Sequence, residues 1–171
     1  MNSKLNIRFA EKDDLSALVE IYNQAIRSKT STGDMTEFTV EERVDWFNKF
    51  DPNTYPIYVA ELNNKVVGYG TISPYRPGRK ALDKTAEISF YVDYADHKQG
   101  IGSTILNHAI SDCERIGKEV LLAFLLDINT SSIGLLKKYG FEEWGRFPTV
   151  FELDEVKCGH LIYGVNLRED D

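Results

Sequence analysis

The stretch from Thr85 to Leu106, TAEISFYVDYADHKQGIGSTIL, constrains the fold of this chain more than any other segment. It begins with a run rich in β-branched and aromatic residues, which predicts a strand. A short polar loop then leads to Gly100-Ile101-Gly102 and to apolar residues at helical spacing. The first N–H groups of a helix have no partner inside it, so this strand–loop–helix unit predicts a site for phosphate groups.

Strands and helices follow one another along the rest of the chain, with no repeat and no linker. Apolar periodicity and turn residues predict further strands at Leu5–Phe9, Ile57–Glu61, Lys65–Ser73, Val120–Leu126, Phe141–Leu153 and Val156–Leu167. Helices are predicted after Asp13, over Val40–Phe50, from Gly100 to about Ile116, and over Thr130–Tyr139. This order predicts a mixed α/β fold with one central sheet flanked by helices, in a single domain over residues 1–171.

Composition narrows the class of protein. The net charge is -7 and no run of Lys or Arg is long, which argues against nucleic acid or an anionic membrane as the main partner. Cys113 and Cys158 lie in no C-x-x-C motif and are expected to be free thiols in a reducing compartment. The N-terminus lacks a signal sequence and no apolar run approaches the ~20 residues of a membrane helix, so a cytoplasmic protein is expected. The scattered histidines predict no metal site.

The glycine loop does not match the two common nucleotide motifs. A P-loop requires G-x-x-x-x-G-K-[ST], which the chain lacks. A dinucleotide fingerprint requires a third glycine after Gly100 and Gly102, and that position is Ile105. On its own, a G-x-G helix start is also compatible with a tight turn that needs small residues.

Glu87 is the candidate general base. Alternation along the strand places Glu87, Ser89 and Tyr91 on one face, and a carboxylate buried there without a partner is costly. One interpretation is an ion pair with Lys84 or Arg79. The other is a base whose pKa is raised by burial.

Two further residues allow both structural and functional interpretations. Asn129 precedes a predicted helix and is suited to capping it, or its amide binds an extended ligand. Arg76, in the loop before the Glu87 strand, is either a solvated charge or a ligand for a substrate carboxylate.

Together these residues resemble the GCN5-related N-acetyltransferase (GNAT) superfamily across nearly the whole chain. Its loop [Q/R]-x-x-G-x-[G/A] is matched by His97-Lys98-Gln99-Gly100-Ile101-Gly102, with His in place of Gln or Arg. Its N-x-x-[A/S]-x-x-L-x-x-x-x-G-F segment is matched from Asn129 to Phe141. The resemblance implies a mixed, mostly antiparallel central sheet flanked by helices.

Within the superfamily, the chain is most similar to the phosphinothricin and methionine sulfone acetyltransferases. Tyr75-Arg76-Pro77 and Thr85-Ala86-Glu87 match segments of that group. The resemblance implies acetyl-CoA-dependent transfer to the amino group of a small amino-acid-like substrate, with Glu87 as base, no metal, and a homodimer. The implied acetyl-CoA residues are Phe90, Tyr91, Val92, Lys98, Gln99, Gly100, Ile101, Gly102, Ser103 and Asn129. The implied substrate residues are Arg76, Lys80, Ala81, Leu82 and Glu87, and an N–H near Tyr91 or Val92 would stabilise the oxyanion.

One position departs from the family pattern. Leu136 stands where many members have Tyr, or His in the phosphinothricin group, as general acid. Leucine donates no proton, but a thiol pKa of ~8.5 makes thiolate departure near neutrality feasible. Two alternatives stay open from the sequence: acetylation of another amine, such as a polyamine or a protein N-terminus, or a non-catalytic acyl-CoA-binding module.

Overall fold

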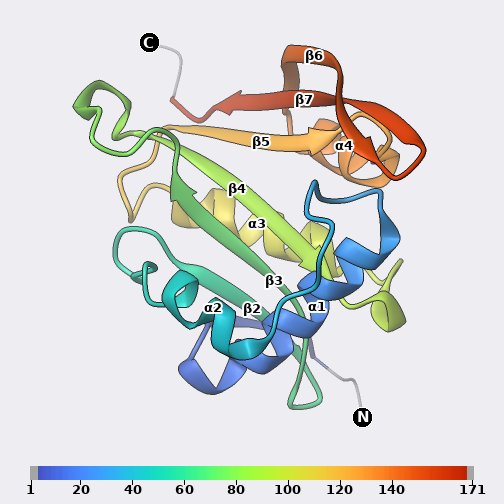
Figure 1. The fold of residues 1–171 in the computed structure, drawn as a ribbon. Coiled ribbons are helices and arrows are strands. Elements are labelled where there is room, and N and C mark those ends of the chain that lie inside the picture. Colours follow the sequence, from blue (N-terminus) through green and yellow to red (C-terminus); the bar gives the residue numbers. More distant parts are fainter. Residues whose placement is uncertain (1–3, 169–171) are drawn as a thin grey trace.

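The computed structural model describes residues 4–168 (Figure 1). The strands are β1 (Asn6–Phe9), β2 (Ile57–Leu62), β3 (Lys65–Pro74), β4 (Thr85–Val92), β5 (Val120–Leu126), β6 (Glu142–Leu153) and β7 (Val156–Asn166). The α-helices are α1 (Leu15–Ser28), α2 (Val40–Phe47), α3 (Ile101–Asp112) and α4 (Thr130–Lys138). Short 3₁₀ turns lie at Lys12–Asp14, Lys80–Leu82 and Tyr94–Asp96.

The strands form one seven-stranded sheet in the order β1-β2-β3-β4-β5-β7-β6. Every neighbouring pair is antiparallel except β4 and β5, which are parallel. The prediction of a mixed, mostly antiparallel sheet flanked by helices is therefore confirmed.

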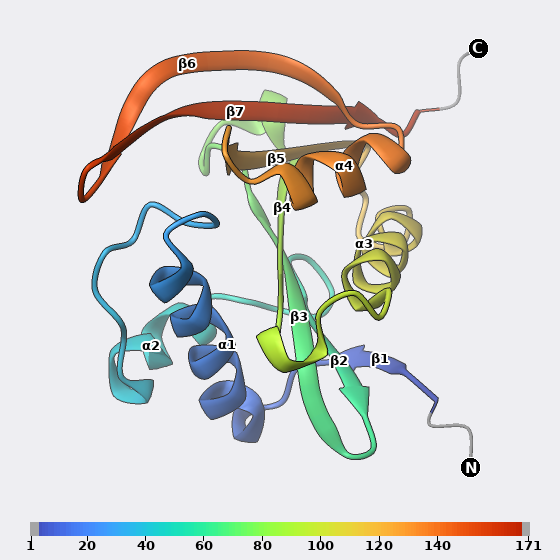
Figure 2. The same ribbon diagram turned by 90° about the vertical axis from the view of Figure 1, so that its right-hand side faces the viewer.

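Helices cover both faces of the sheet, which Figure 2 shows between α1 and α2 on one side and α3 and α4 on the other. On the first face, Leu18 and Ile21 of α1 pack with Val59 and Tyr69. On the second, residues of α3 and α4 form the largest core cluster with the sheet, including Ile88, Leu106, Ala109, Leu121 and Leu136. Burial of this apolar area is the main stabilising contribution to such a fold.

The sheet splits at its centre. The parallel pairing of β4 with β5 covers only Thr85–Val120, Ala86–Leu121 and Glu87–Leu122. Beyond Glu87 the two strands separate, as Figure 1 shows, although β4 runs on to Val92 and β5 to Leu126. The backbone edges of both strands are left unpaired along the split, so the fold itself provides a slot for an extended ligand.

Element ends differ from the predictions by a few residues. The helix predicted over Val40–Phe50 ends at Phe47, because the chain turns and Asp51 pairs with Tyr55 in an isolated bridge. The regular part of α3 ends at Asp112 rather than near Ile116. In residues 4–168, no helix has the length and apolar character needed to cross a membrane, and no cluster of His, Cys, Asp and Glu has a metal-binding arrangement.

Candidate active site

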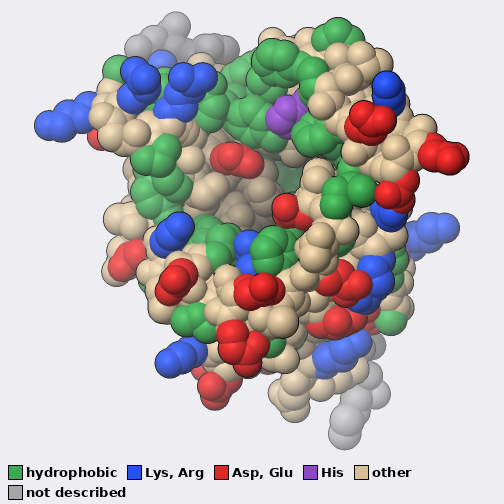
Figure 3. All heavy atoms as spheres, in the orientation of Figure 1, with side chains coloured by type: hydrophobic (Ala, Val, Ile, Leu, Met, Phe, Trp, Pro, Cys, Tyr) green, Lys and Arg blue, Asp and Glu red, His purple; other side chains and the backbone are tan. Residues whose placement is uncertain are grey.

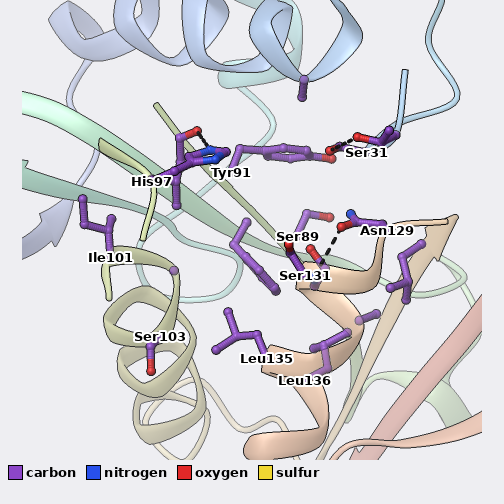
Figure 4. A pocket seen from close by; sticks show the side chains of 18 of the residues that line it. Ser31, Ser89, Tyr91, His97, Ile101, Ser103, Asn129, Ser131, Leu135 and Leu136 are labelled. Carbon is purple, nitrogen blue, oxygen red and sulfur yellow. Dashed lines mark hydrogen bonds between the residues drawn. The ribbon is translucent and has the colours of Figure 1, made fainter. Parts of the chain in front are cut away.

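A cavity of about 590 Å³ follows the split between β4 and β5. Its walls come from the end of α1, the second half of β4, the starts of α3 and α4, and Ala123, Phe124 and Leu125 of β5. Figure 4 shows these side chains converging from separate elements, with Ser89, Tyr91 and Asn129 near its middle and Ile101 and Ser103 on α3. Segments far apart in the sequence therefore build one long cavity.

The direction of the free backbone groups follows from the ladders beside the split. Asp93 donates its N–H to the carbonyl of Val67 at 2.8 Å, so the facing pair Gly68–Val92 is a non-hydrogen-bonded pair of the antiparallel ladder. The N–H and C=O groups of Val92, and of Phe90 two residues earlier, therefore point away from β3, whereas those of Tyr91 face β3. The carbonyl of Val92 is hydrogen-bonded to His97 Nε2 at 3.0 Å, so among the described residues the N–H of Val92 and both groups of Phe90 remain free for a ligand in the split. The same argument applies to β5, where the N–H of Asp127 donates to the carbonyl of Gly159 at 3.0 Å. The backbone N–H and C=O groups of Phe124 therefore point away from β7 and into the split.

The start of α3 presents unpaired donors. Within residues 4–168, the N–H groups of Lys98 to Ser103 have no hydrogen-bond acceptor. Gly100 precedes the helix at φ +76°, a left-handed conformation that favours glycine. At Gly102, a Cβ would lie 3.3 Å from Leu135, so the absence of a side chain keeps this end of the cavity open. Such a ring of donors at the positive end of a helix fits a phosphate group.

Asn129 caps α4, as expected, and leaves its amide nitrogen free within residues 4–168. Its Oδ1 accepts the N–H of Ser132 at 3.3 Å and caps α4. Its Nδ2 donates to no acceptor in the described chain and lies on the cavity wall, beside Ser89 in Figure 4. Leu136, on the same helix, is buried and also lines the cavity.

Glu87 lies at the point where the split begins and is half-buried. Neither of the proposed ion pairs forms: Lys84 pairs with Glu119 instead, and no basic side chain in residues 4–168 lies within ion-pair distance of Glu87. Burial raises the pKa of the Glu87 carboxyl. A half-buried carboxylate without a partner is suited to accept a proton.

Polar side chains surround Glu87 on the face that carries α1 and α2. In the β3–β4 register Ser73 lies opposite Glu87, Thr71 opposite Ser89, and Tyr69 opposite Tyr91. Figure 3 shows this face hollowed at its centre, with acidic, histidine and apolar side chains around the depression. We call this depression the hollow.

An aromatic wall borders the hollow on the side of β5, β6 and β7. Tyr75 stacks on Phe124 with ring centroids 6.0 Å apart, and His160 lies 5.5 Å from Phe124. His160 also contacts Phe147 and Phe151 at 6.2 and 5.0 Å. Burial lowers the pKa of His160, so this wall is apolar and uncharged near neutral pH.

The sequence profile of the acetyltransferase (GNAT) family matches residues 16–141. The chain belongs to the acetyltransferase (GNAT) family. The prediction made from the glycine loop and the Asn129 segment is confirmed, and the chain is an acyltransferase by family.

Relatives and solved structures agree with this assignment. YwnH of Bacillus subtilis, provisionally named a phosphinothricin acetyltransferase, is 39% identical over 163 residues, covering 95% of this chain and 99% of YwnH. A Salmonella typhimurium L-methionine sulfoximine/L-methionine sulfone acetyltransferase is 32% identical over 146 residues, 85% of each chain. The structure of YncA from Salmonella typhimurium with its cofactor acetyl-CoA superposes with a TM-score of 0.91 at 29% identity, covering 99% and 97% of the two chains.

Apart from Glu87, the predicted site residues of this family member fall into three groups. Phe90, Tyr91, Val92, Lys98, Gly100, Ile101, Gly102, Ser103 and Asn129 line the cavity. Gln99 is exposed in the loop beside it. Arg76 and the Lys80–Leu82 turn lie in the loop between β3 and β4, outside the cavity lining, and Arg76 is exposed with its guanidinium 5.8 Å from the Tyr75 ring.

Sequence reasoning missed the residues that pack around the strands of the site from other elements. His160 and Phe147 come from the C-terminal hairpin, and Arg43 and Trp46 come from α2. No motif marks them, because their positions near the hollow depend on how the helices and the hairpin pack onto the sheet. The spacing of Arg43 and Trp46, three residues apart on one helix, is the signal that places those two side by side.

Proposed function

We propose that this protein transfers an acetyl group from acetyl-CoA to the amino group of a small amino-acid-like acceptor, of the phosphinothricin or methionine sulfoximine/sulfone type. The observation that carries the proposal is Glu87, a half-buried carboxylate without a cation, where the split begins. The names and the similarity of YwnH and the Salmonella enzyme support the acceptor class.

The residues along the split fit acetyl-CoA. The free N–H groups from Lys98 to Ser103 would hold its pyrophosphate. The free N–H and C=O groups of Phe90 would pair with the amides of its pantetheine arm, Val92 would bind its acetyl group, and Asn129 Nδ2 would contact the arm from the other side. Bound in this way, acetyl-CoA supplies the acetyl group as a thioester.

Glu87 has the properties of a general base. Its raised pKa keeps it able to accept a proton from the acceptor ammonium through water, because the carboxylate is not stabilised by a neighbouring cation. The neutral amine can then attack the thioester carbonyl. Of the two residues considered for the oxyanion, Val92 directs its N–H into the split, and a well-placed donor of this kind is worth about 3–4 kcal/mol.

Two other features concern the acceptor carboxylate and the leaving thiolate. Arg76 and the turn Lys80, Ala81 and Leu82 would hold the acceptor carboxylate from the loop before β4. Leu136 gives the leaving thiolate no acid, so the thiol departs as an anion or takes its proton from solvent, which a thiol pKa of about 8.5 allows.

Assembly and compartment are further parts of the proposal. A homodimer is supported by the exposed apolar side chains Trp144, Phe147, Val150 and Val156, which gather on the β6–β7 hairpin. A cytoplasmic location is supported by Cys113 and Cys158, which are both free and buried.

An acceptor panel tests the function. Release of free thiol from acetyl-CoA would be measured with phosphinothricin, methionine sulfone, methionine sulfoximine, unmodified amino acids, a polyamine and a peptide with a free N-terminus. We expect turnover with amino acids that carry a free carboxylate, and the highest kcat/KM with the oxidised or phosphinyl analogues. Turnover confined to the polyamine or the peptide would contradict the proposal, as would acetyl-CoA binding with no turnover on any amine.

A further inference from the structure

Helix α2, which covers the same face of the sheet as Glu87, contains an arginine held among three rings. Arg43 of α2 places its Cζ 4.1 Å from the ring centroid of Trp46, 4.9 Å from that of Phe38 and 5.2 Å from that of Tyr22. We call these four residues the Arg43 cage. Cation–π contacts of this kind fix the plane of a guanidinium while leaving the N–H groups at its edge free to donate.

Arg43 differs from the other arginines of the chain. Arg8, Arg27, Arg115, Arg146 and Arg168 each pair with a carboxylate. Arg76 and Arg79 lack such a partner but are exposed loop residues. Among residues 4–168, Arg43 alone is a half-buried arginine with neither an ion pair nor a hydrogen bond to another protein group. A guanidinium partly removed from water without an anion is costly, which suggests that its partner is a ligand.

The Arg43 cage packs against the same face of β3 and β4 that carries Glu87. Tyr22 packs edge-on against Tyr91 with centroids 5.1 Å apart, and Trp46 contacts Tyr69, which lies beside Tyr91 at 5.5 Å. Tyr69 and Tyr91 are part of the polar and aromatic floor that continues through Ser89 to Glu87.

We propose that Arg43 binds the oxygen atoms of the acceptor's side chain, as found in a sulfone, sulfoximine, phosphinate or carboxylate group. This inference rests on the proposed function, because it assigns one part of the same acceptor. It makes Arg43 a specificity-determining residue that distinguishes oxidised or acidic side chains from plain aliphatic ones. Arg and oxo-anion geometry match well, since the guanidinium presents parallel N–H donors.

The distances favour the side chain over the α-carboxylate as the bound group. Tyr91 lies four residues beyond Glu87 on β4, which is about 13 Å along a strand. The acceptor amine must lie beside the thioester, with Glu87 acting on it through water, and the α-carboxylate stays beside the amine, since only the Cα separates the two groups. The extended side chain is the part of the acceptor that can leave this point and reach across the floor to the Tyr91 end and the Arg43 cage.

Trp46 provides a direct readout of binding that does not depend on turnover. The chain has two tryptophans, so the variant Trp144→Phe leaves Trp46 as the only source of tryptophan fluorescence. In this background we would titrate the protein, with CoA present, with methionine sulfone, phosphinothricin and methionine. We expect a saturable change in fluorescence with the first two ligands, and Arg43→Gln should weaken their binding roughly 10- to 100-fold, the range for a charge-assisted hydrogen bond.

Controls separate this role from a structural one. Methionine, which lacks the side-chain oxygens, should change by less than a few-fold in Arg43→Gln, and Arg27→Gln, which removes an exposed and already paired arginine, should leave all three ligands unchanged. Arg43→Lys should recover part of the affinity, because it restores the charge but not the parallel donors. An equal loss for methionine and methionine sulfone, or no fluorescence response to either oxidised ligand, would overturn the inference. The acceptor panel with the wild-type protein tests the proposed function separately. Turnover of amino acids in that panel would support the function even if Arg43→Gln had no effect on binding.

Discussion

Asp14 and Glu87 are two acidic residues that the fold removes from water in opposite ways. Asp14 is 9% exposed and accepts hydrogen bonds from Arg8 Nη1 and Nη2 at 2.7 and 2.9 Å and from the N–H of Glu11 at 2.7 Å. Burial acts to raise the pKa of Asp14, but these hydrogen bonds outweigh it and the pKa is lowered. At Glu87 burial acts with no cation to oppose it, and the pKa is raised.

The difference separates a structural charge from a reactive one. The Arg8–Asp14 pair, extended by Glu61, joins β1 and β2 to the start of α1. This pair stabilises the fold. Because its hydrogen bonds lower the pKa of Asp14, the carboxylate stays ionised near neutral pH and does not act as a base. A buried carboxylate without a partner, such as Glu87, lowers the stability of the folded protein but is a better proton acceptor. This compromise is common at catalytic sites.

The largest expected effect is the loss of activity in Glu87→Gln. General bases contribute about 10²–10⁴-fold, so kcat should fall by that range in a thiol-release assay while the KM for acetyl-CoA changes little. Glu119→Gln is the matched control, because Glu119 is exposed and paired with Lys84 and Arg168. An unchanged kcat in Glu87→Gln would remove the distinction between the two carboxylates.

The reverse result is expected for Asp14→Asn. Removing one partner of a partly buried ion pair leaves Arg8 without its bidentate acceptor, so the free energy of unfolding should fall by about 2–3 kcal/mol. Urea unfolding measures this, and the kcat of the folded fraction should be that of wild type. The deficit should shrink as the pH falls below about 4 through the lowered folded pKa, since wild type then loses the same contribution. An unfolding midpoint equal to that of wild type would contradict the structural role of Asp14.

A smaller effect on acetyl-CoA binding is expected at the start of α3, where the phosphate groups are proposed to bind. Two glycine variants, one at this site and one away from it, make the comparison. Gly100→Ala places a Cβ at φ +76° and should cost about 1 kcal/mol and raise the KM for acetyl-CoA several-fold. Gly134→Ala, on α4 with open space around the new methyl group, should instead stabilise the protein by up to about 1 kcal/mol. Equal KM values for acetyl-CoA in the two variants would contradict the role of the α3 start.

The smallest effect is on the stability of Glu87→Gln. Because the folded pKa of Glu87 is raised, its contribution to stability is complete below the unfolded pKa of about 4.3 and is lost as the pH rises through the folded value. Glutamine stays neutral, so the variant should be slightly more stable than wild type at pH 7 and equal to it near pH 3. Thermal unfolding at both values checks this, and a variant less stable than wild type at pH 7 would indicate a missing partner for Glu87.

Much of the fold was predictable because each element carries its own local signal. The strands around Glu87 and the turn at Asn63-Asn64 follow from residue patterns that need no tertiary context, and the two asparagines do adopt positive φ. The end of α2 was missed because the Asp51–Tyr55 bridge, not the sequence of the helix, stops it.

The site was predictable only where it lies on one continuous segment. The cavity residues from Phe90 to Ser103 follow directly after Glu87, so one motif identified them. Arg43 and His160 lie far from it in the chain. They come near the hollow through packing of α2 and the β6–β7 hairpin, for which the sequence holds no local signal.

The pH dependence of kcat/KM in wild type and Glu87→Gln, with methionine sulfone as acceptor, tests the central claim most directly. We predict that wild-type kcat/KM rises with pH through an ionisation above the ordinary glutamate pKa, in accord with the burial of Glu87. That ionisation should be absent from the residual activity of Glu87→Gln, and present in Glu119→Gln. The same ionisation in the Glu87→Gln profile, with kcat/KM near that of wild type, would contradict the account.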